Sequence, residues 1–172
     1  LGAAGASDEH AETVGDHLAD ANMAGHDSHG FIRISQYVSD IRDGSTDPKA
    51  HPEVVSEDTG MAKVDGKATF GQVVATFSVE LAVKKARESG IGMVTMGNLA
   101  HTGRIGTYPE MATREGMAAI MCTGQVTASD RGVAPFGGRV GRLSTNPISM
   151  ASPYKPDAPV LLDFATSIGA EG

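Results

Sequence analysis

Apolar residues recur every three or four positions in four stretches of the chain, which is the spacing of one face of an α-helix. In residues 7–24 this stripe runs through Val14, Leu18 and Ala21, and the acidic residues of the first turns suit the helix dipole. Gly25 follows as a natural C-terminal stop. The same spacing predicts helices over residues 28–42, 72–89 and 104–115, each followed closely by a glycine.

Short apolar runs between these helices predict strands. Residues 61–64 and 67–70 flank an Asp-Gly pair, which supplies the positive φ angles of a two-residue hairpin turn. Residues 45–60 are polar and read as a loop that holds a short strand at 54–55. Further strands are expected at residues 92–96, 117–123, 147–152 and 159–163. Because strand, helix and strand follow one another in residues 92–123, this region has the order of a βαβ unit.

Composition narrows the class of protein. The chain has 172 residues, 40% of them hydrophobic and 20% charged, which indicates a soluble globular protein with a substantial core. The net charge of −7 argues against nucleic-acid binding, and no apolar run is long enough for a membrane span. The single cysteine, Cys122, fits a reducing cytoplasm. A start at Leu1 instead of methionine suggests part of a longer chain.

Residues 26–37 concentrate polar chemistry at one expected helix start. If the helix begins near Ser28, that hydroxyl is a natural N-cap, and His29, Arg33 and Tyr37 fall at i, i+4 and i+8 on one face. A helix N-terminus beside an imidazole and a guanidinium favours a small anion such as a carboxylate. An ordinary amphipathic helix with a solvated face explains the same pattern equally well.

A second candidate lies in residues 98–106, which follow an apolar strand and open a helix. His101 in this loop is suited to general acid/base work, because imidazole titrates near neutral pH. A surface histidine without a function is the alternative. The Gly-rich and Asn-Pro segments at 133–138 and 143–147, and the small-residue turn at 163–167, could approach a phosphate or ribose, or could simply build turns.

Several common sites are missing from the sequence. No G-x-G-x-x-G run follows a strand and opens a helix, so a Rossmann dinucleotide site is not indicated, and no P-loop is present. His26 and His29 could touch a metal ion, but no second cluster has metalloenzyme spacing. We therefore expect no metal site.

Together these segments resemble the malate/L-lactate dehydrogenases of the second type, a family that includes ureidoglycolate, sulfolactate and 2,3-diketogulonate dehydrogenases. Five motifs match in family order: Gly-His-Asp-Ser-His-Gly at 25–30, His-Thr-Gly at 101–103, Pro-Phe-Gly-Gly at 135–138, Thr-Asn-Pro at 145–147 and Asp-Phe-Ala-Thr-Ser at 163–167. Arg33 and Tyr37 accompany the first motif. One departure is Ser144, which stands where a glycine usually precedes Thr-Asn-Pro.

The resemblance implies a mixed α/β fold with N-terminal helices and a non-Rossmann, largely antiparallel cofactor domain. That sheet conflicts with the βαβ order seen in residues 92–123, and we give the family precedence because short strands do not reveal their direction. Residues 1–60 would contribute the substrate site, and residues 61–172 would form the first part of the nicotinamide-binding domain. A homodimer is also implied.

The resemblance further implies hydride transfer between NAD or NADP and a small 2-hydroxy/2-oxo acid. Arg33 would clamp the substrate carboxylate, with Tyr37 also contacting the substrate. His101 would exchange the hydroxyl proton, while His29 hydrogen-bonds the same oxygen and Ser28 orients it. The reverse assignment, with His29 as the proton carrier, stays open. The residues expected to contact the cofactor are Thr145, Asn146, Pro147, Asp163, Ala165, Thr166 and Ser167. Asp163 is alternatively a partner that holds an imidazole in its working tautomer. A non-catalytic carboxylate-binding module and a metal-dependent lyase are the two competing hypotheses.

Overall fold

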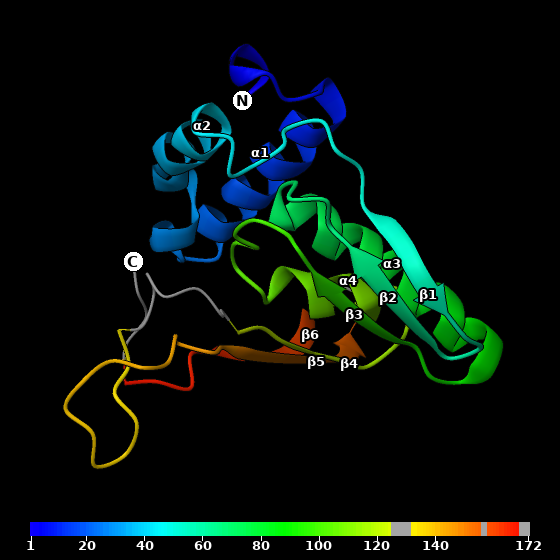
Figure 1. Cartoon of the computed structure of the whole chain (residues 1–172). Helices are drawn as coiled ribbons and strands as arrows, with labels where there is room; N and C mark the ends of the chain where they lie inside the picture. The colour runs from blue at the N-terminus through cyan, green and yellow to red at the C-terminus, as the bar shows by residue number, and fades with distance from the viewer. Residues whose placement is uncertain (125–131, 156–157, 169–172) are drawn as a thin grey trace. The chain divides into compact units, whose positions relative to one another are not determined.

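The computed structural model describes residues 1–124, 132–155 and 158–168 (Figure 1). The chain forms two compact units, Leu1–Thr107 and Tyr108–Gly172, and each is described by itself. The predicted boundary at residue 60 separates a substrate-binding segment from a cofactor-binding segment. It describes function and not compact units, so it stays a prediction.

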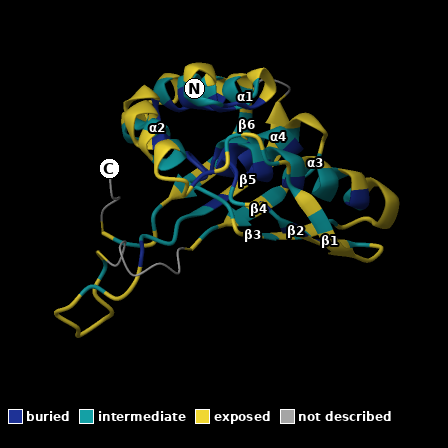
Figure 2. Cartoon of the chain, turned by 45° about the horizontal axis from the view of Figure 1, so that its top comes forward, coloured by how far each residue is buried: buried dark blue, intermediate teal, exposed yellow. Residues whose placement is uncertain are grey.

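The first helix confirms its predicted bounds. After a short 3-10 helix, η1 (Gly2–Ala4), helix α1 spans Asp8–Met23. The Ser7 side chain caps it by accepting a hydrogen bond from the His10 backbone N–H at 3.2 Å. Gly25 follows with φ +78°, a conformation in which glycine carries no steric penalty. The outer surfaces of α1 and α2 are exposed, and the buried residues of α1 lie on its inner side (Figure 2).

The second helix begins later than predicted. Helix α2 spans Ile34–Arg42, and the residues before it form two 3-10 turns, η2 (Asp27–His29) and η3 (Phe31–Arg33). Gly30 separates these turns in an extended conformation, and a Cβ there would overlap the side-chain amide of Asn22. The side-chain oxygen Oδ1 of Asn22 accepts a hydrogen bond from the Phe31 backbone N–H at 2.9 Å. The prediction that Ser28 caps this helix is therefore wrong, since a tertiary hydrogen bond interrupts the local pattern.

The later start also changes the face of α2 that is buried. Tyr37 is 3% exposed and belongs to the main core cluster with Val14, Leu18 and Phe70, whereas Ile34 is 38% exposed. A helix from residue 28 would also turn the apolar residues Ile34, Val38 and Ile41 toward the core. This expectation is wrong for Ile34, whereas Val38 and Ile41 are half-buried and Ile41 packs against the core cluster. A buried phenol is acceptable only with a hydrogen-bond partner, and the partners of Tyr37 define the site described below.

Sheet A combines strands β1 (Glu53–Glu57), β2 (Met61–Asp65) and β3 (Met93–Gly97), in that order. β1 pairs antiparallel with β2, and β2 pairs parallel with β3. Helix α3 (Gly71–Ser89) makes the crossover between β2 and β3, as Figure 1 shows, and packs against both strands and against α1. The predicted helix at 72–89 and the short strand near Val54 are confirmed.

The hairpin predicted around Asp65 and Gly66 is wrong. β2 ends at Asp65, and its antiparallel partner precedes it, so the turn lies at residues 58–60. Gly66 serves close packing instead, because a Cβ there would lie 2.7 Å from the Asn98 carbonyl oxygen and 2.8 Å from Leu99 Cβ. The position does require glycine, but for close packing against residues 98 and 99 and not for a hairpin turn.

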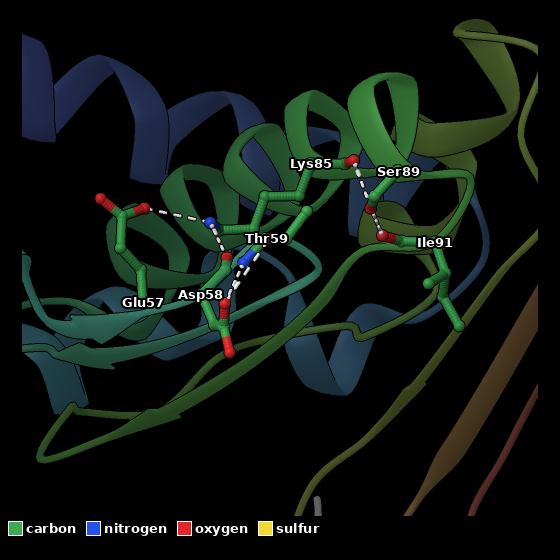
Figure 3. Close-up of polar contacts among 6 residues, drawn as sticks. All are labelled: Glu57, Asp58, Thr59, Lys85, Ser89 and Ile91. Carbon is green, nitrogen blue, oxygen red and sulfur yellow. Dashed lines mark hydrogen bonds and ion pairs between the residues drawn. The ribbon is translucent and has the colours of Figure 1, made fainter.

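A buried lysine ties α3 to the β1–β2 turn (Figure 3). The Nζ of Lys85 lies 3.0 Å from Glu57 Oε2 and donates to the Asp58 carbonyl oxygen at 2.7 Å, and the Lys85 side chain is only 8% exposed. At the end of the helix, the Ser89 hydroxyl lies 3.0 Å and 2.7 Å from the carbonyl oxygens of Lys85 and Ile91. These bonds anchor the helix at the edge from which β3 departs.

The second unit is built on an antiparallel sheet, sheet B. Helix α4 (Thr107–Arg114) leads into it, and its strands are β4 (Ala119–Cys122), β5 (Ile148–Lys155) and β6 (Ala158–Phe164), in that order. Because β3 and β4 belong to different sheets, the βαβ prediction for residues 92–123 is wrong. Three of the four strand pairings in the described ranges are antiparallel. The mixed α/β, largely antiparallel and non-Rossmann fold class is confirmed.

Candidate active site

Residues from four separate segments of the first unit converge on His101. Tyr37 on α2 places its Oη 2.9 Å from His101 Nδ1. His29 in η2 stacks on the same imidazole, with ring centroids 5.5 Å apart and planes 26° from parallel. The predicted residues His29, Tyr37 and His101 are thus brought together by the fold, although the last two are 64 positions apart in the sequence.

The loop that carries His101 is fixed to the start of α3. Its Ala100 backbone N–H donates to the Thr69 carbonyl oxygen at 2.9 Å, and the Ala68 N–H donates to the Asn98 carbonyl oxygen at 2.8 Å. Gly71 permits this approach, because a Cβ there would collide with the carbonyl oxygens of Ala100 and His101. The imidazole is therefore held by backbone contacts on rigid elements.

Arg33 connects the two 3-10 turns. Its Nε donates to the Ser28 carbonyl oxygen at 2.6 Å, and its Nη1 donates to Gln36 Oε1 at 3.0 Å. The Ser28 hydroxyl lies 2.9 Å from His29 Nδ1. Ser28 thus contacts one of the two site histidines, and Arg33 stands beside both, since its charge lowers the pKa of each. His26, discounted as a ligand, is exposed.

Two members of the cluster were not predicted from the sequence. Gln72, 1% exposed at the start of α3, donates from Nε2 to Tyr37 Oη at 2.8 Å. His17, 5% exposed on α1, sits against the His101 loop, where a Cβ on Gly103 would overlap its Nε2. The sequence did contain one indication for His17. It lies on the same helix face as the apolar residues Val14 and Leu18, where a buried polar side chain often has a functional role.

Burial and positive charge keep the site histidines neutral. Burial, followed by the charges of His29, Arg33 and His17, lowers the pKa of His101 to about 4. Burial, then Arg104 and His29, lowers the pKa of His17 to about 4 as well. For His29 the pKa is also lowered, by burial first and then by Arg33 and His26. A carboxylate bound at Arg33 would offset that positive charge and favour protonation of the imidazoles.

The predicted cofactor residues occupy two adjoining turns in the second unit. Thr166 ties them together, because its backbone N–H and its Oγ1 both lie 3.1 Å from the Thr145 carbonyl oxygen, and Oγ1 also reaches the Asn146 carbonyl oxygen at 2.9 Å. Ser144 donates to Asn146 Oδ1 at 2.6 Å, so the serine that replaces the family glycine orients this side chain. The remaining predicted residues adjoin them, Pro147 just before β5, Asp163 near the end of β6, and Ala165 and Ser167 after it.

These turns suit a nucleotide ligand. They carry hydroxyl, amide and backbone groups, which can hydrogen-bond ribose and phosphate oxygens, together with the carboxylate of Asp163, which can accept from a ribose hydroxyl. A Cβ on Gly124 would lie 3.2 Å from Asn146 Oδ1, so a larger residue there would fill the space beside the amide. In the described ranges, no group of three or more His, Cys, Asp or Glu side chains is arranged to hold a metal ion.

The family model described as malate/L-lactate dehydrogenase matches residues 1–172. The chain belongs to this family. It is 40% identical over 168 residues to hydroxycarboxylate dehydrogenase B of Escherichia coli O157:H7, covering 98% of this chain and 46% of that protein. It is 42% identical over 164 residues to a malate dehydrogenase of Pyrococcus horikoshii, with 95% and 44% covered. The solved malate dehydrogenase structure from Pyrococcus horikoshii OT3 matches with TM-score 0.91 and 41% identity, over 97% of this chain and 47% of that chain.

The chain thus spans about half the length of the curated relatives it matches. Family membership confirms the predicted resemblance and implies a nicotinamide cofactor, without distinguishing NAD from NADP. Each helix in the described ranges lacks the length or the apolar content needed to cross a membrane.

Proposed function

We propose that this protein is a dehydrogenase that transfers a hydride between NAD or NADP and a small 2-hydroxy/2-oxo acid such as malate or lactate. The observation that carries the proposal is the convergence of His29, Arg33, Tyr37 and His101 on one point. The relatives named malate dehydrogenase and hydroxycarboxylate dehydrogenase support the same class of reaction.

Arg33 is the proposed carboxylate ligand. A guanidinium has five N–H donors in a planar fork that matches a carboxylate, and the two bonds to Ser28 and Gln36 leave that fork fixed in direction. Holding the acid by its carboxylate also orients its C2 oxygen. This contact gives the site its preference for 2-hydroxy and 2-oxo acids over neutral alcohols.

The proton is exchanged by His101 in this proposal. When the acid is oxidised, its C2 hydrogen leaves as hydride and its hydroxyl proton passes to the imidazole. His29, stacked on His101, hydrogen-bonds the same oxygen, and Ser28 orients His29 through Nδ1. His29 as proton carrier is the competing assignment.

In the second unit, the turns at 144–147 and 163–167 would hold the nicotinamide cofactor, which supplies or accepts the hydride. The residues proposed for this are Thr145, Asn146, Pro147, Asp163, Ala165, Thr166 and Ser167. A homodimer, a cytoplasmic location and the assignment of residues 1–60 to substrate binding complete the proposal.

The test follows nicotinamide absorbance with the protein, each reduced cofactor and a panel of 2-oxo acids. We expect turnover with at least one pair, and a loss of about 10²- to 10⁴-fold in kcat for His101→Ala with cofactor affinity unchanged. His51→Ala, an exposed histidine that contacts none of the site residues, is the matched control. Binding of the acid without oxidation of either cofactor would favour the carboxylate-binding module instead. Near-native turnover of His101→Ala would assign the proton exchange to His29.

A further inference from the structure

We propose that Tyr37 and Gln72 are positioning residues that hold neutral His101 with its hydrogen on Nε2 and pass protons through Nδ1. The inference rests on the proposed function, because the relay serves the proton exchange assigned to His101. It replaces the sequence-based expectation that Tyr37 contacts the substrate. It also assigns a role to Gln72, which no sequence motif indicated.

The direction of the first bond follows from the orientation of the Gln72 amide, which turns its nitrogen toward Tyr37. Gln72 Nε2 can only donate, so Tyr37 Oη accepts at 2.8 Å. Both side chains are buried, with Tyr37 3% and Gln72 1% exposed. A buried hydroxyl needs an acceptor for its own hydrogen, since leaving it unpaired carries the desolvation penalty of that group without compensation.

The second bond then follows from the first. His101 Nδ1 lies 2.9 Å from Tyr37 Oη and takes the phenolic hydrogen. If Nδ1 carried the hydrogen instead, Tyr37 would accept both bonds, and its hydrogen would have no acceptor in the part of the chain that the structure describes. The neutral imidazole therefore carries its hydrogen on Nε2, where it can donate to a substrate oxygen.

This arrangement moves a proton without charging the imidazole. As C2 of a 2-oxo acid accepts hydride, the substrate oxygen takes the Nε2 hydrogen, and Nδ1 takes the phenolic hydrogen of Tyr37. The negative charge passes to Tyr37 Oη, where the Gln72 N–H stabilises it. After product release, a proton from water binds Nε2 and the Nδ1 hydrogen returns to Tyr37. Oxidation of the hydroxy acid runs through the same steps in reverse.

The surrounding charges favour a neutral route. His29, Arg33 and His17 face His101 from η2, η3 and α1, and with burial they lower its pKa to about 4. In the protein without substrate, an imidazolium beside Arg33 is disfavoured at pH 7, so His101 starts the reaction neutral. Burial raises the pKa of Tyr37 to about 12, so its hydrogen stays in place in the resting protein.

The test reads the tautomer directly, in protein with ¹⁵N-labelled histidine. Long-range ¹H–¹⁵N spectra at pH 8 show which ring nitrogen carries the hydrogen, and His101→Gln assigns the signals. We expect hydrogen on Nε2. Tyr37→Phe keeps the ring but removes the hydroxyl, and should produce a mixture of both tautomers. Tyr154→Phe, at an exposed tyrosine, should change nothing. Hydrogen on Nδ1 in the unchanged protein, or an unaltered tautomer in Tyr37→Phe, would overturn the relay.

A second variant reverses the direction of the relay. Gln72→Glu replaces the donor by an acceptor of the same length, so Tyr37 should donate to the carboxylate and accept from His101. The His101 hydrogen is then expected on Nδ1. If Tyr37→Phe does not fold, the spectrum of Gln72→Glu tests the proposal by itself. A hydrogen that stays on Nε2 of His101 in this variant contradicts the proposal.

Kinetics separate positioning from substrate contact. Tyr37→Phe should lower kcat about 100-fold with the 2-oxo acid KM within about twofold of the original, because the lost group acts through His101. A raised KM with unchanged kcat would make Tyr37 a substrate ligand and refute the relay. The spectra need neither cofactor nor substrate. Tautomers as expected without any turnover would therefore support the positioning of His101 by Tyr37 and Gln72 while rejecting the proposed function and, with it, the proton transfer.

Discussion

His17 shows how a single buried side chain makes this protein sensitive to acid. Its imidazole is 5% exposed on α1, and burial followed by the charges of Arg104 and His29 lowers its pKa to about 4 from an ordinary value of 6.5. The unfolded chain therefore binds a proton near pH 6.5 that the folded protein refuses until about pH 4. Stability from this group is complete above pH 6.5 and is lost as the pH falls toward 4.

We expect His17→Gln to remove this dependence. The free energy of unfolding of the unchanged protein, minus that of the variant, should fall by the order of 3 kcal/mol between pH 7 and pH 4. Urea unfolding at half-unit pH steps measures it, with His26→Gln at an exposed position as the control. A difference that stays constant across this range would mean that His17 titrates normally in the fold.

Single residues also show what the sequence could and could not predict about the site. His29, Arg33 and His101 were identified from residue type and motif order, because anion binding and proton exchange need those groups. Gln72 and His17 were missed, since an amide in a helix and a histidine in an apolar stripe acquire meaning only from their tertiary neighbours. Tyr37 was identified together with its partner His101, but its hydrogen-bond donor Gln72 was not.

At the scale of elements, Lys85 joins α3 to the turn between β1 and β2. Its ammonium donates to Glu57 and to the Asp58 carbonyl oxygen, and the carboxylate of Glu57 is itself 60% exposed. Lys85→Met keeps the packed stem and removes both bonds, while water can still solvate Glu57. We expect a loss of about 1–2 kcal/mol in the free energy of unfolding, measured by urea denaturation.

The neighbouring lysine provides a matched comparison. Lys84 lies on the same helix and is exposed, so Lys84→Met should change stability by less than about 0.5 kcal/mol. Equal effects of the two substitutions would show that the Lys85 contacts contribute nothing net and that the helix is held by apolar packing alone.

Elements were predicted well where local signals agreed with tertiary structure. The helices at 7–24 and 72–89 carry both a periodic apolar stripe and a glycine stop, and both are confirmed. The helix expected from residue 28 starts at Ile34, because Asn22 binds the backbone at Phe31. The Asp-Gly pair at 65–66 misled because a glycine needed for close approach looks the same in sequence as one needed for a turn.

At the scale of the whole molecule, strand partners were the least predictable feature. Strands of four to eight residues such as β3, β4 and β5 give no sign of their direction or their sheet. Sequence order alone joined β3 to β4, and only family resemblance indicated the antiparallel arrangement. The fold class was therefore predicted from five motifs in family order, and the helices were predicted from the periodicity of apolar residues.

One face of sheet B carries an uncovered row of apolar side chains across all three strands. Ile120, Met150 and Leu162 lie opposite one another in the strand register and are 71%, 37% and 51% exposed. Val160 and Phe164 extend the row along β6 at 61% and 44% exposed. A contiguous apolar surface of this kind favours association, because covering it removes apolar area from water.

We therefore expect the 17.7 kDa chain to self-associate through this face of sheet B, with an average mass that rises with concentration in sedimentation experiments. Leu162→Lys places a charge in the middle of the row and should shift the midpoint of association to at least tenfold higher concentration, since burying an unpaired ammonium is costly. Ile91→Lys introduces the same charge outside sheet B, at a position that is 69% exposed against 51% for Leu162, and should leave association unchanged. If the unchanged chain stays monomeric at every concentration, or if both variants associate as it does, the exposed row does not mediate contacts between copies.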